Sequence, residues 1–365
     1  MSREAGLPLS RLGILLIVMM VGHLVASLGS GPAVLRLGPG RLLFLGMLLY
    51  AASAAGFAVA PGWGGLLLAS LLTGAAAGLI DGGLNAYAAA RFSPGVLIWV
   101  HACFGAGAML GPLLVSRVLE TGRSWRASYV LIAGALVVMA VGLAVTRRRL
   151  DSVDRQSVGT ALQPPLRLAE TLAHPEAWVG ALLFCLYVGL EATPGRWAYS
   201  LLTEARGVAP ERAAGAVAAY WASLTLGRTL LGVVARRVAP HVMVRACLMV
   251  APLGVVLLWV GGDGAASWLG LVLMGLCFAP VFPLLIALTP ERVAPGHVRH
   301  AIGLQVSAAA LGGGAVPGAI GLIARRTGIE VLGPFLFAAA LTTLVLYEAI
   351  EARARRRLIT PLPSP

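Results

Sequence analysis

Long apolar segments separated by short polar linkers cover almost the whole chain. Each has about 20 residues, the length that an α-helix needs to cross the hydrocarbon core of a bilayer. We predict eleven transmembrane helices, at residues 12–30, 41–60, 64–88, 96–119, 127–146, 177–201, 213–235, 242–261, 265–288, 301–323 and 331–350. The hydrophobic pattern therefore predicts an all-α, polytopic membrane protein.

One linker is much longer than the others and divides the predicted helices. Residues 147–176 are rich in charge and contain Pro164 and Pro165. We therefore predict an N-terminal half with five helices (residues 1–146), a cytoplasmic central linker (147–176), a C-terminal half with six helices (177–357) and a disordered tail (358–365).

The composition agrees with a membrane protein. Of the 365 residues, 58% are hydrophobic and 12% are charged, whereas a soluble domain has about 25% charged residues. All 28 basic residues are arginine, and the net charge is +13. These arginines lie between apolar runs, with no basic stripe among exposed aromatic residues, so the expected partner is the lipid bilayer and no nucleic acid.

The arginines also predict an orientation, because they are concentrated in alternate linkers. By the positive-inside rule, the central linker and the C-terminus are expected to be cytoplasmic. We predict a multi-pass protein of a bacterial inner membrane, with Met1 outside. The opening residues do not have the pattern of a cleavable signal peptide.

Motifs for catalysis and for metal binding are absent from the sequence. There is no HExxH, GxSxG or Walker pattern. The four cysteines lie inside apolar runs without CxxC spacing, at Cys103, Cys185, Cys247 and Cys277. We therefore expect no enzyme activity, no cofactor, no disulfide and no metal site.

The two halves contain related stretches in the same order, which predicts an internal parallel repeat. The matched positions are Gly31 with Gly232, Arg36 with Arg237, Pro39 with Pro240, Gly107 with Gly312 and Pro112 with Pro317. The first five predicted helices pair with the last five. The segment at 177–201 has no counterpart.

The predicted helix at 64–88 carries an acid, Asp81, and an amide, Asn85, at membrane depth. At about 100° per residue, both share one helix face with three glycines at four-residue spacing: Gly74, Gly78 and Gly82. A carboxyl group in the membrane usually marks a substrate or proton route. We predict proton coupling at Asp81 and substrate contact at Asn85; the alternative is a protonated Asp81 that joins helices.

A second acid at membrane depth is Glu191, which shares a helix face with Tyr187. We predict a role for Glu191 in proton coupling and for Tyr187 in substrate binding. The alternative for Glu191 is a structural hydrogen bond to the other half. Arg228 is a candidate gating residue, although we favour the alternative of an interfacial arginine that pairs with helix ends.

Three further residues are candidates for contact with a polar substrate. His101 and Gln305 occupy related places in the repeat, and Trp221 offers a flat apolar face of the kind that stacks on a sugar. The alternatives are a packed, hydrogen-bonded histidine and an aromatic anchor at the membrane interface. His23 carries a weaker signal of the same kind.

Four stretches resemble the fucose-permease-like branch of the major facilitator superfamily: IDGGLNAYAAARF at residue 80, HACFGAGAMLGPLL at 101, YVGLEATPGRW at 187 and YWASLTLGRTLLG at 220. The resemblance implies twelve helices in two six-helix halves, alternating access, and proton-coupled sugar uptake. An acid on the family's fourth helix takes part in coupling there, and Asp81 matches its position.

The sequence departs from this family pattern in two places. The segment at 12–30 resembles the family's second helix, so the first helix and its acid are missing. We favour a start codon upstream of Met1, or a partial chain, over a genuine eleven-helix form. Arg36 and Arg237 resemble the cytoplasmic signature between helices two and three and are candidate latch residues, although its usual acidic residue is absent.

The function predicted from the sequence is secondary active transport of a small polar solute, such as a sugar, by a proton-coupled monomer. The site is expected near the bilayer midplane, lined by the segments at 64–88, 96–119, 177–201, 213–235 and 301–323. Gly107 and Gly111 are expected to pack helices closely. The alternatives are a drug or metabolite efflux antiporter and a transport-inactive membrane sensor or assembly protein.

Overall fold

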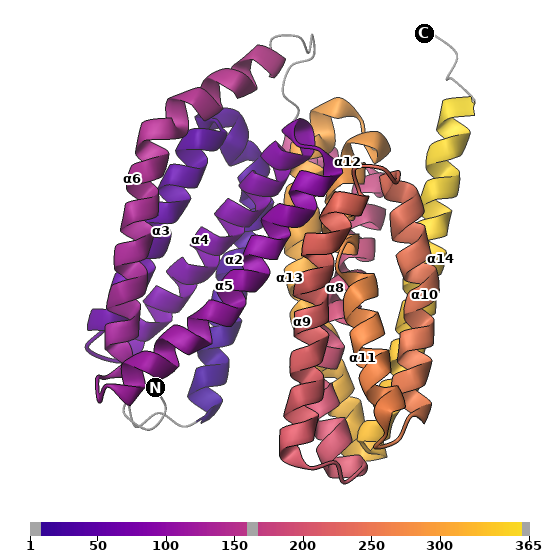
Figure 1. Ribbon diagram of the computed structural model, residues 1–365. Coiled ribbons are helices and arrows are strands. Elements are labelled where there is room, and N and C mark those ends of the chain that lie inside the picture. The colour runs from indigo at the N-terminus through magenta and orange to yellow at the C-terminus, as the bar shows by residue number, and fades with distance from the viewer. Residues whose placement is uncertain (1–8, 159–166, 360–365) are drawn as a thin grey trace. The chain divides into compact units, whose positions relative to one another are not determined.

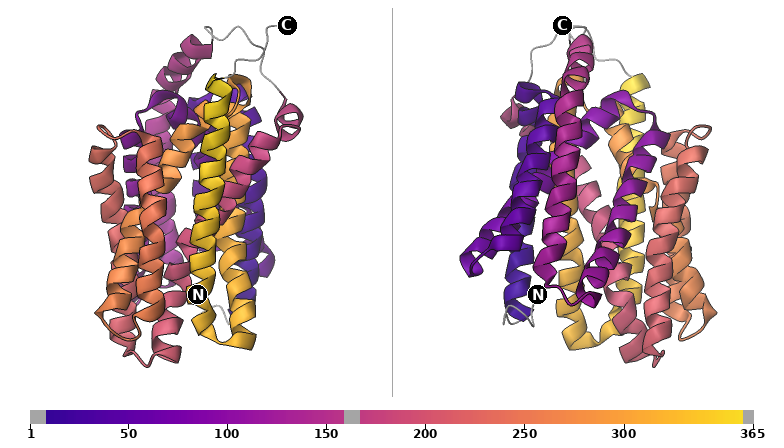
Figure 2. Two further views of the ribbon diagram at one scale, coloured as in Figure 1. Left: turned by 90° about the vertical axis from the view of Figure 1, so that its right-hand side faces the viewer. Right: turned by 60° about the vertical axis from the view of Figure 1, so that its left-hand side comes forward.

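A computed structural model of the chain describes residues 9–158 and 167–359. Every regular element in these ranges is a helix, and no strand occurs there (Figures 1 and 2). Ten helices are long and apolar enough to cross a membrane, and the apolar stretch Pro94–Gly107 begins an eleventh. The all-α, polytopic fold is confirmed, and these helices agree roughly with the predicted count of eleven.

The helices follow one another with short connections (Figure 1). The first five are α2 (Leu9–Leu37), α3 (Pro39–Val59), α4 (Trp63–Arg91), α5 (Pro94–Glu120) and α6 (Trp125–Val158), followed by the short α7 (Leu168–Leu172). The rest are α8 (Pro175–Ser200), α9 (Pro210–Val234), α10 (Pro240–Val260), α11 (Ala265–Phe278), α12 (Val281–Arg292), α13 (Val298–Thr327) and α14 (Leu332–Ile359). α8 ends in a π-helical turn at Leu201–Ala205, and α13 begins after a 3₁₀ turn at Pro295–His297.

Proline sets the start of several helices. Pro39, Pro210 and Pro240 occupy the first turn of α3, α9 and α10. Proline fits there because its missing N–H has no partner within the helix and its φ is already helical. The turn before α3 also needs Gly38, whose φ of +82° is unfavourable for other residues.

The end of α6 differs from the prediction. Residues 147–158 continue the helix, although their charge had suggested a linker. The reason is visible at Asp151, which is buried: its Oδ1 accepts a 2.8 Å hydrogen bond from the backbone N–H of Gly40 at the start of α3. A carboxylate stabilises the N-terminus of a helix. Residues 159–166 of the predicted linker lie outside the described residues, and α14 extends to Ile359, beyond which the predicted tail is also outside them.

The chain forms two compact units, and two helices are divided between them. Unit 1 contains residues up to Ala88, Ala106–Ala177 and Ala294–Ala310; unit 2 contains Ala89–Gly105, Trp178–Val293 and the residues from Leu311. The first part of α5 therefore belongs with the C-terminal helices, and the first part of α13 belongs with the N-terminal helices. The packing of α2 and α9 explains this exchange.

In unit 1, α2 is in close contact with both α4 and α13. On α4, a Cβ atom at Gly74 or Gly78 would collide with the α2 backbone, so these two glycines allow the helices to touch. On the other side of α2, Ser27 and Ser307 of α13 share a hydrogen bond of 2.8 Å between their hydroxyl oxygens. Small residues on all three helices allow this approach.

Unit 2 repeats the arrangement around α9. A Cβ atom at Gly275 of α11 would collide with the backbone of Tyr220, as one at Gly74 would collide with the backbone of Met19. On its other side, α9 contacts the first part of α5, where Gly105 packs on Thr225. The matched contacts occur at the positions that the sequence repeat relates, which supports the parallel repeat.

These glycines make a prediction for stability. Gly74→Ala is expected to destabilise the fold by about 1–3 kcal/mol, because the added methyl group meets backbone that cannot rotate away. Gly134→Ala on α6 is the matched control, since a Cβ there has no atom within 4 Å. Thermal denaturation of the detergent-solubilised variants measures both. Equal melting temperatures for the two variants would contradict the packing role of Gly74.

Candidate functional site

The polar group of unit 1 is built around Asp81 on α4. Asn85, one helical turn later, donates a hydrogen bond of 2.7 Å to Asp81 Oδ1 and one of 3.0 Å to its backbone oxygen. Asn85 is itself buried. The structure thus brings the two predicted residues together, with Asn85 holding the carboxylate in place.

His23 on α2 faces the other oxygen of the same carboxyl group. Its Nε2 lies 4.0 Å from Asp81 Oδ2. The His23 side chain is 18% exposed and that of Asp81 is 40% exposed, so the carboxyl group is accessible while the ring is mostly enclosed. The neighbouring glycines, Gly78 and Gly82, pack against His23, Ser27 and Ser30 of α2, as their spacing predicted.

The polar group of unit 2 is an ion pair between Glu191 on α8 and Arg228 on α9. Arg228 Nη2 lies 3.3 Å from Glu191 Oε1, and the two side chains are only 6% and 14% exposed. Charges at membrane depth are rare unless they are paired. Arg228 is therefore buried and paired with an acid, and its role in gating stays a prediction.

Tyr187 and the end of α11 complete the polar group of unit 2. The Tyr187 hydroxyl oxygen lies 2.5 Å from Glu191 Oε2 and 2.7 Å from the backbone oxygen of Phe278, so its single hydrogen is shared between these two acceptors. Arg228 Nε donates to the backbone oxygen of Ala279, at 3.2 Å, where α11 ends before Pro280. The guanidinium thus satisfies a carbonyl that the broken helix leaves without a partner.

Two residues predicted to contact substrate, Tyr187 and Trp221, differ in their exposure. Tyr187 is fully buried and its hydroxyl group contacts Glu191 and the backbone of Phe278, so its contact with a substrate stays a prediction. Trp221 is 42% exposed, and one face of its ring covers Gly195. It therefore remains available for stacking.

The remaining predicted polar residues are divided between the units. His101 belongs to unit 2, where its backbone oxygen accepts a hydrogen bond from Arg228 and its ring packs edge-on against Phe282 at 5.0 Å. Gln305 is buried on the part of α13 that belongs to unit 1.

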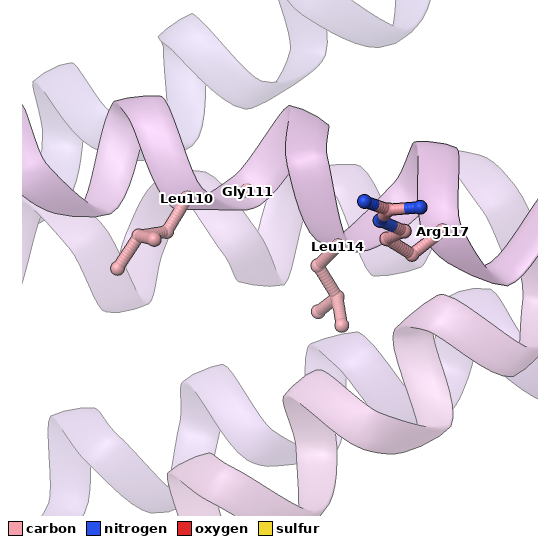
Figure 3. A pocket seen from close by; sticks show the side chains of 4 residues that line it. All are labelled: Leu110, Gly111, Leu114 and Arg117. Carbon is pink, nitrogen blue, oxygen red and sulfur yellow. The ribbon is translucent and has the colours of Figure 1, made fainter.

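The candidate latch residues and the second glycine pair have few described contacts, and the latch stays a prediction. Arg36 and Arg237 are exposed, and the described residues show no ion pair for either. No described atom lies within 4 Å of a Cβ built at Gly107 or Gly111, so no helix packs closely there. Instead, Gly111 lines an open apolar pocket with Leu110, Leu114 and Arg117 (Figure 3).

The sequence did not reveal the pairings of Glu191 with Arg228 and of Asp81 with His23. The partners lie far apart in the chain and come from different helices, so no local spacing relates them. For the second group, the available signal in the sequence was Arg228 itself, because an arginine inside an apolar segment requires a partner. Within the described residues, no group of three His, Cys, Asp or Glu side chains could hold a metal ion.

Comparison with known proteins gives a family match over most of the chain. Residues 1–317 match the family model described as Major Facilitator Superfamily. A curated relative, Bypass of stop codon protein 6 of Saccharomyces cerevisiae, is 26% identical over an alignment of 267 residues that covers 64% of this chain. This match spans 53%, about half, of the yeast protein's length.

Solved structures of transporters share the fold. A variant of the fucose:proton symporter of E. coli superposes with a TM-score of 0.73 at 16% identity, over 93% of this chain and 90% of that one. The proton:xylose symporter with bound 6-bromo-6-deoxy-D-glucose gives 0.75 at 12% identity, over 94% and 86%. The human organic anion transporter MFSD10 gives 0.72 at 19% identity, over 95% and 87%.

Proposed function

The chain belongs to the Major Facilitator Superfamily, and from this premise we propose that it moves a small polar solute, with a sugar as first candidate, by proton-coupled alternating access. That it is a multi-pass membrane transporter and no enzyme follows from the family. Two of its structural neighbours are sugar:proton symporters. The identity of the substrate and the coupling to protons are what we propose for this chain.

The observation that carries proton coupling is the surroundings of Asp81. A carboxyl group at membrane depth needs water, a partner or a proton. Asp81 is partly exposed and has no arginine beside it: its described polar neighbours are Asn85 and His23. Its charge can therefore be neutralised by taking up a proton and restored by losing it.

Glu191 has different surroundings and receives a different role. Arg228 compensates its charge, and Tyr187 occupies its second oxygen. A carboxylate held by these fixed partners has little room to exchange a proton in each cycle. We therefore assign proton coupling to Asp81 alone and place Glu191 with Arg228 in a fixed polar network.

The choice of a neutral polar solute follows from charge. Arg228 and Glu191 together carry no net charge, so they do not offer a free cation to an anionic substrate. The exposed part of the Trp221 ring suits the apolar face of a sugar ring. The likeness to an organic anion transporter keeps an anionic metabolite as the second candidate.

The sequence halves, the sidedness and the oligomeric state remain part of the proposal. We place the central linker and the C-terminus in the cytoplasm of a bacterial cell because of the arginine distribution. The transporter is proposed to act as a monomer. Import is proposed over export because two structural neighbours are proton symporters, and symport with an inward proton gradient carries the solute inward.

Uptake into proteoliposomes tests this function. L-fucose, D-xylose and D-glucose are offered one at a time with an imposed inward proton gradient, beside a panel of organic anions. At least one sugar is expected to accumulate above its external concentration, and a protonophore should remove the accumulation. Accumulation of anions without any sugar, or proton-driven exit from preloaded vesicles only, would favour the alternatives.

A further inference from the structure

The two oxygens of the Asp81 carboxyl group lie in different surroundings. Oδ1 accepts the hydrogen bond from Asn85. Oδ2 is directed towards His23, whose Nε2 is 4.0 Å away. That nitrogen is buried and has no hydrogen-bond partner among the described residues. Buried polar atoms without a partner are rare in folded proteins and call for an explanation.

Helix packing keeps the two groups together. The backbone of His23 touches both Gly74 and Gly78, because neither glycine has a side chain to separate α2 from α4. Asp81 lies about one helical turn beyond Gly78, and Asn85 fixes the orientation of its carboxyl group. A movement of about 1 Å brings Nε2 within hydrogen-bond distance of Oδ2.

We propose that His23 and Asp81 form a proton-sharing pair, in which the coupling proton is held by Asp81 Oδ2 or by His23 Nε2. This inference rests on the proposed proton coupling and adds a second proton-holding residue to it. In the loaded state, in which the pair holds the coupling proton, it is either a carboxylic acid with a neutral imidazole or a carboxylate with an imidazolium. Transfer breaks the O–H bond and forms the N–H bond, so the net charge of the pair stays zero.

Loss of the proton to water leaves a carboxylate and a neutral imidazole, with one negative charge. The loaded pair is thus the form that is neutral within the membrane. Because Nε2 is enclosed and the carboxyl group is partly exposed, exchange with water occurs through Asp81. His23 holds the proton on the enclosed side of the pair, away from water.

The repeat argues against a purely structural reason for these residues. By the match of Gly31 with Gly232 and of the contacts at Gly74 and Gly275, the equivalents of His23 and Asp81 in unit 2 are Leu224 and Phe282. Both are apolar, and α11 still approaches α9 closely at Gly275, although Phe282 lies on α12, beyond the break after α11. The close approach of the two helices therefore does not need an acid and a histidine.

Few other titratable groups lie against this pair in unit 1. On α13, the groups that contact α2 near His23 are the hydroxyl of Ser307 and the backbone at Gly303. His300 and Arg299 contact α2 at Gly31, about two helical turns away from His23. On α4, Asn85 is the polar neighbour of Asp81 and does not titrate.

Nuclear magnetic resonance tests the pair without a known substrate. The chain has six histidines, so the ¹⁵N signals of their rings can be assigned with a His23→Gln variant and followed against pH in the detergent-solubilised full chain. The ¹³C signal of the Asp81 carboxyl is followed in parallel and assigned with Asp81→Asn. Two coupled groups share the same apparent midpoints of titration.

The expected result is a common midpoint in the His23 and Asp81 curves of the unaltered protein. Asp81→Asn should move the His23 midpoint by about one pH unit or more, and His23→Gln should do the same to Asp81. Asp263→Asn, in an exposed loop, and His241→Gln are controls that leave both curves unchanged.

A flat His23 curve, or one that Asp81→Asn does not alter, would overturn the pair. If one variant fails to fold, the common midpoint in the unaltered protein and the reciprocal variant still decide. These titrations do not depend on transport, so the pair can hold when no sugar is accumulated and can fail when one is. Where uptake is found, His23→Gln should shift the pH profile of accumulation and spare exchange.

Discussion

Asp81→Asn is expected to abolish proton-driven accumulation while solute exchange continues at a reduced rate. The amide keeps the size of the side chain and cannot take up or release a proton. The loaded and unloaded states then have the same charge, so the proton gradient no longer favours either direction. Proteoliposomes should fill only to the external concentration of the solute, as measured by uptake of radiolabelled sugar with and without a proton gradient.

Exchange is the internal control for this variant. Counterflow between preloaded and external solute needs an intact site and no net proton movement, so it shows that the variant is folded and binds. Asp263→Asn on an exposed loop is the matched variant and should accumulate solute normally. Full accumulation by Asp81→Asn would remove Asp81 from the coupling mechanism.

Arg228→Ala is expected to lower the free energy of unfolding by about 3–5 kcal/mol, the usual cost of removing one member of a buried ion pair. Glu191 is left without its partner, and the carbonyl of Ala279 at the helix break loses its donor. Thermal denaturation in detergent should show a large loss of stability, and transport should be lost with it.

Two further variants separate charge from packing. Glu191→Gln combined with Arg228→Ala should recover part of the loss, because no unpaired charge remains. Arg245→Ala breaks a pair with Glu348 that is 29% and 41% exposed, and should change stability little. An Arg228→Ala variant as stable as Arg245→Ala would show that the pair is not buried in the membrane protein.

The helices could be predicted because membrane-spanning length is encoded in continuous apolar runs. The end of α6 could not, because arginines and aspartates at 147–158 resemble a linker. Asp151 reaches the start of α3, and only the folded unit shows that this capping contact exists. The predicted end of the helix was placed where the residues become polar, whereas the observed helix continues because Asp151 forms a hydrogen bond with a residue far away in the sequence.

Two glycine pairs with the same spacing have different surroundings among the described residues. Gly74 and Gly78 share their four-residue spacing with Gly107 and Gly111, yet only the first pair meets another backbone. Spacing identifies a face on which a helix can pack, and it does not tell whether a neighbour is there. The same limit explains the missed pairs, since Asp81 and Glu191 were recognised as exceptional while their partners on α2 and α9 were not.

The division of α5 and α13 between the two units limits how the protein can change shape. Each helix passes from one unit to the other without interruption, at Gly105–Ala106 in α5 and at Ala310–Leu311 in α13. Any displacement of one unit as a rigid body must be absorbed by bending there. The chain places Gly105 and Gly107 at one crossing and Gly312, Gly313 and Gly314 at the other. We expect α5 and α13 to bend most easily at these glycines, so that stiffening them with alanine slows turnover more than it weakens binding.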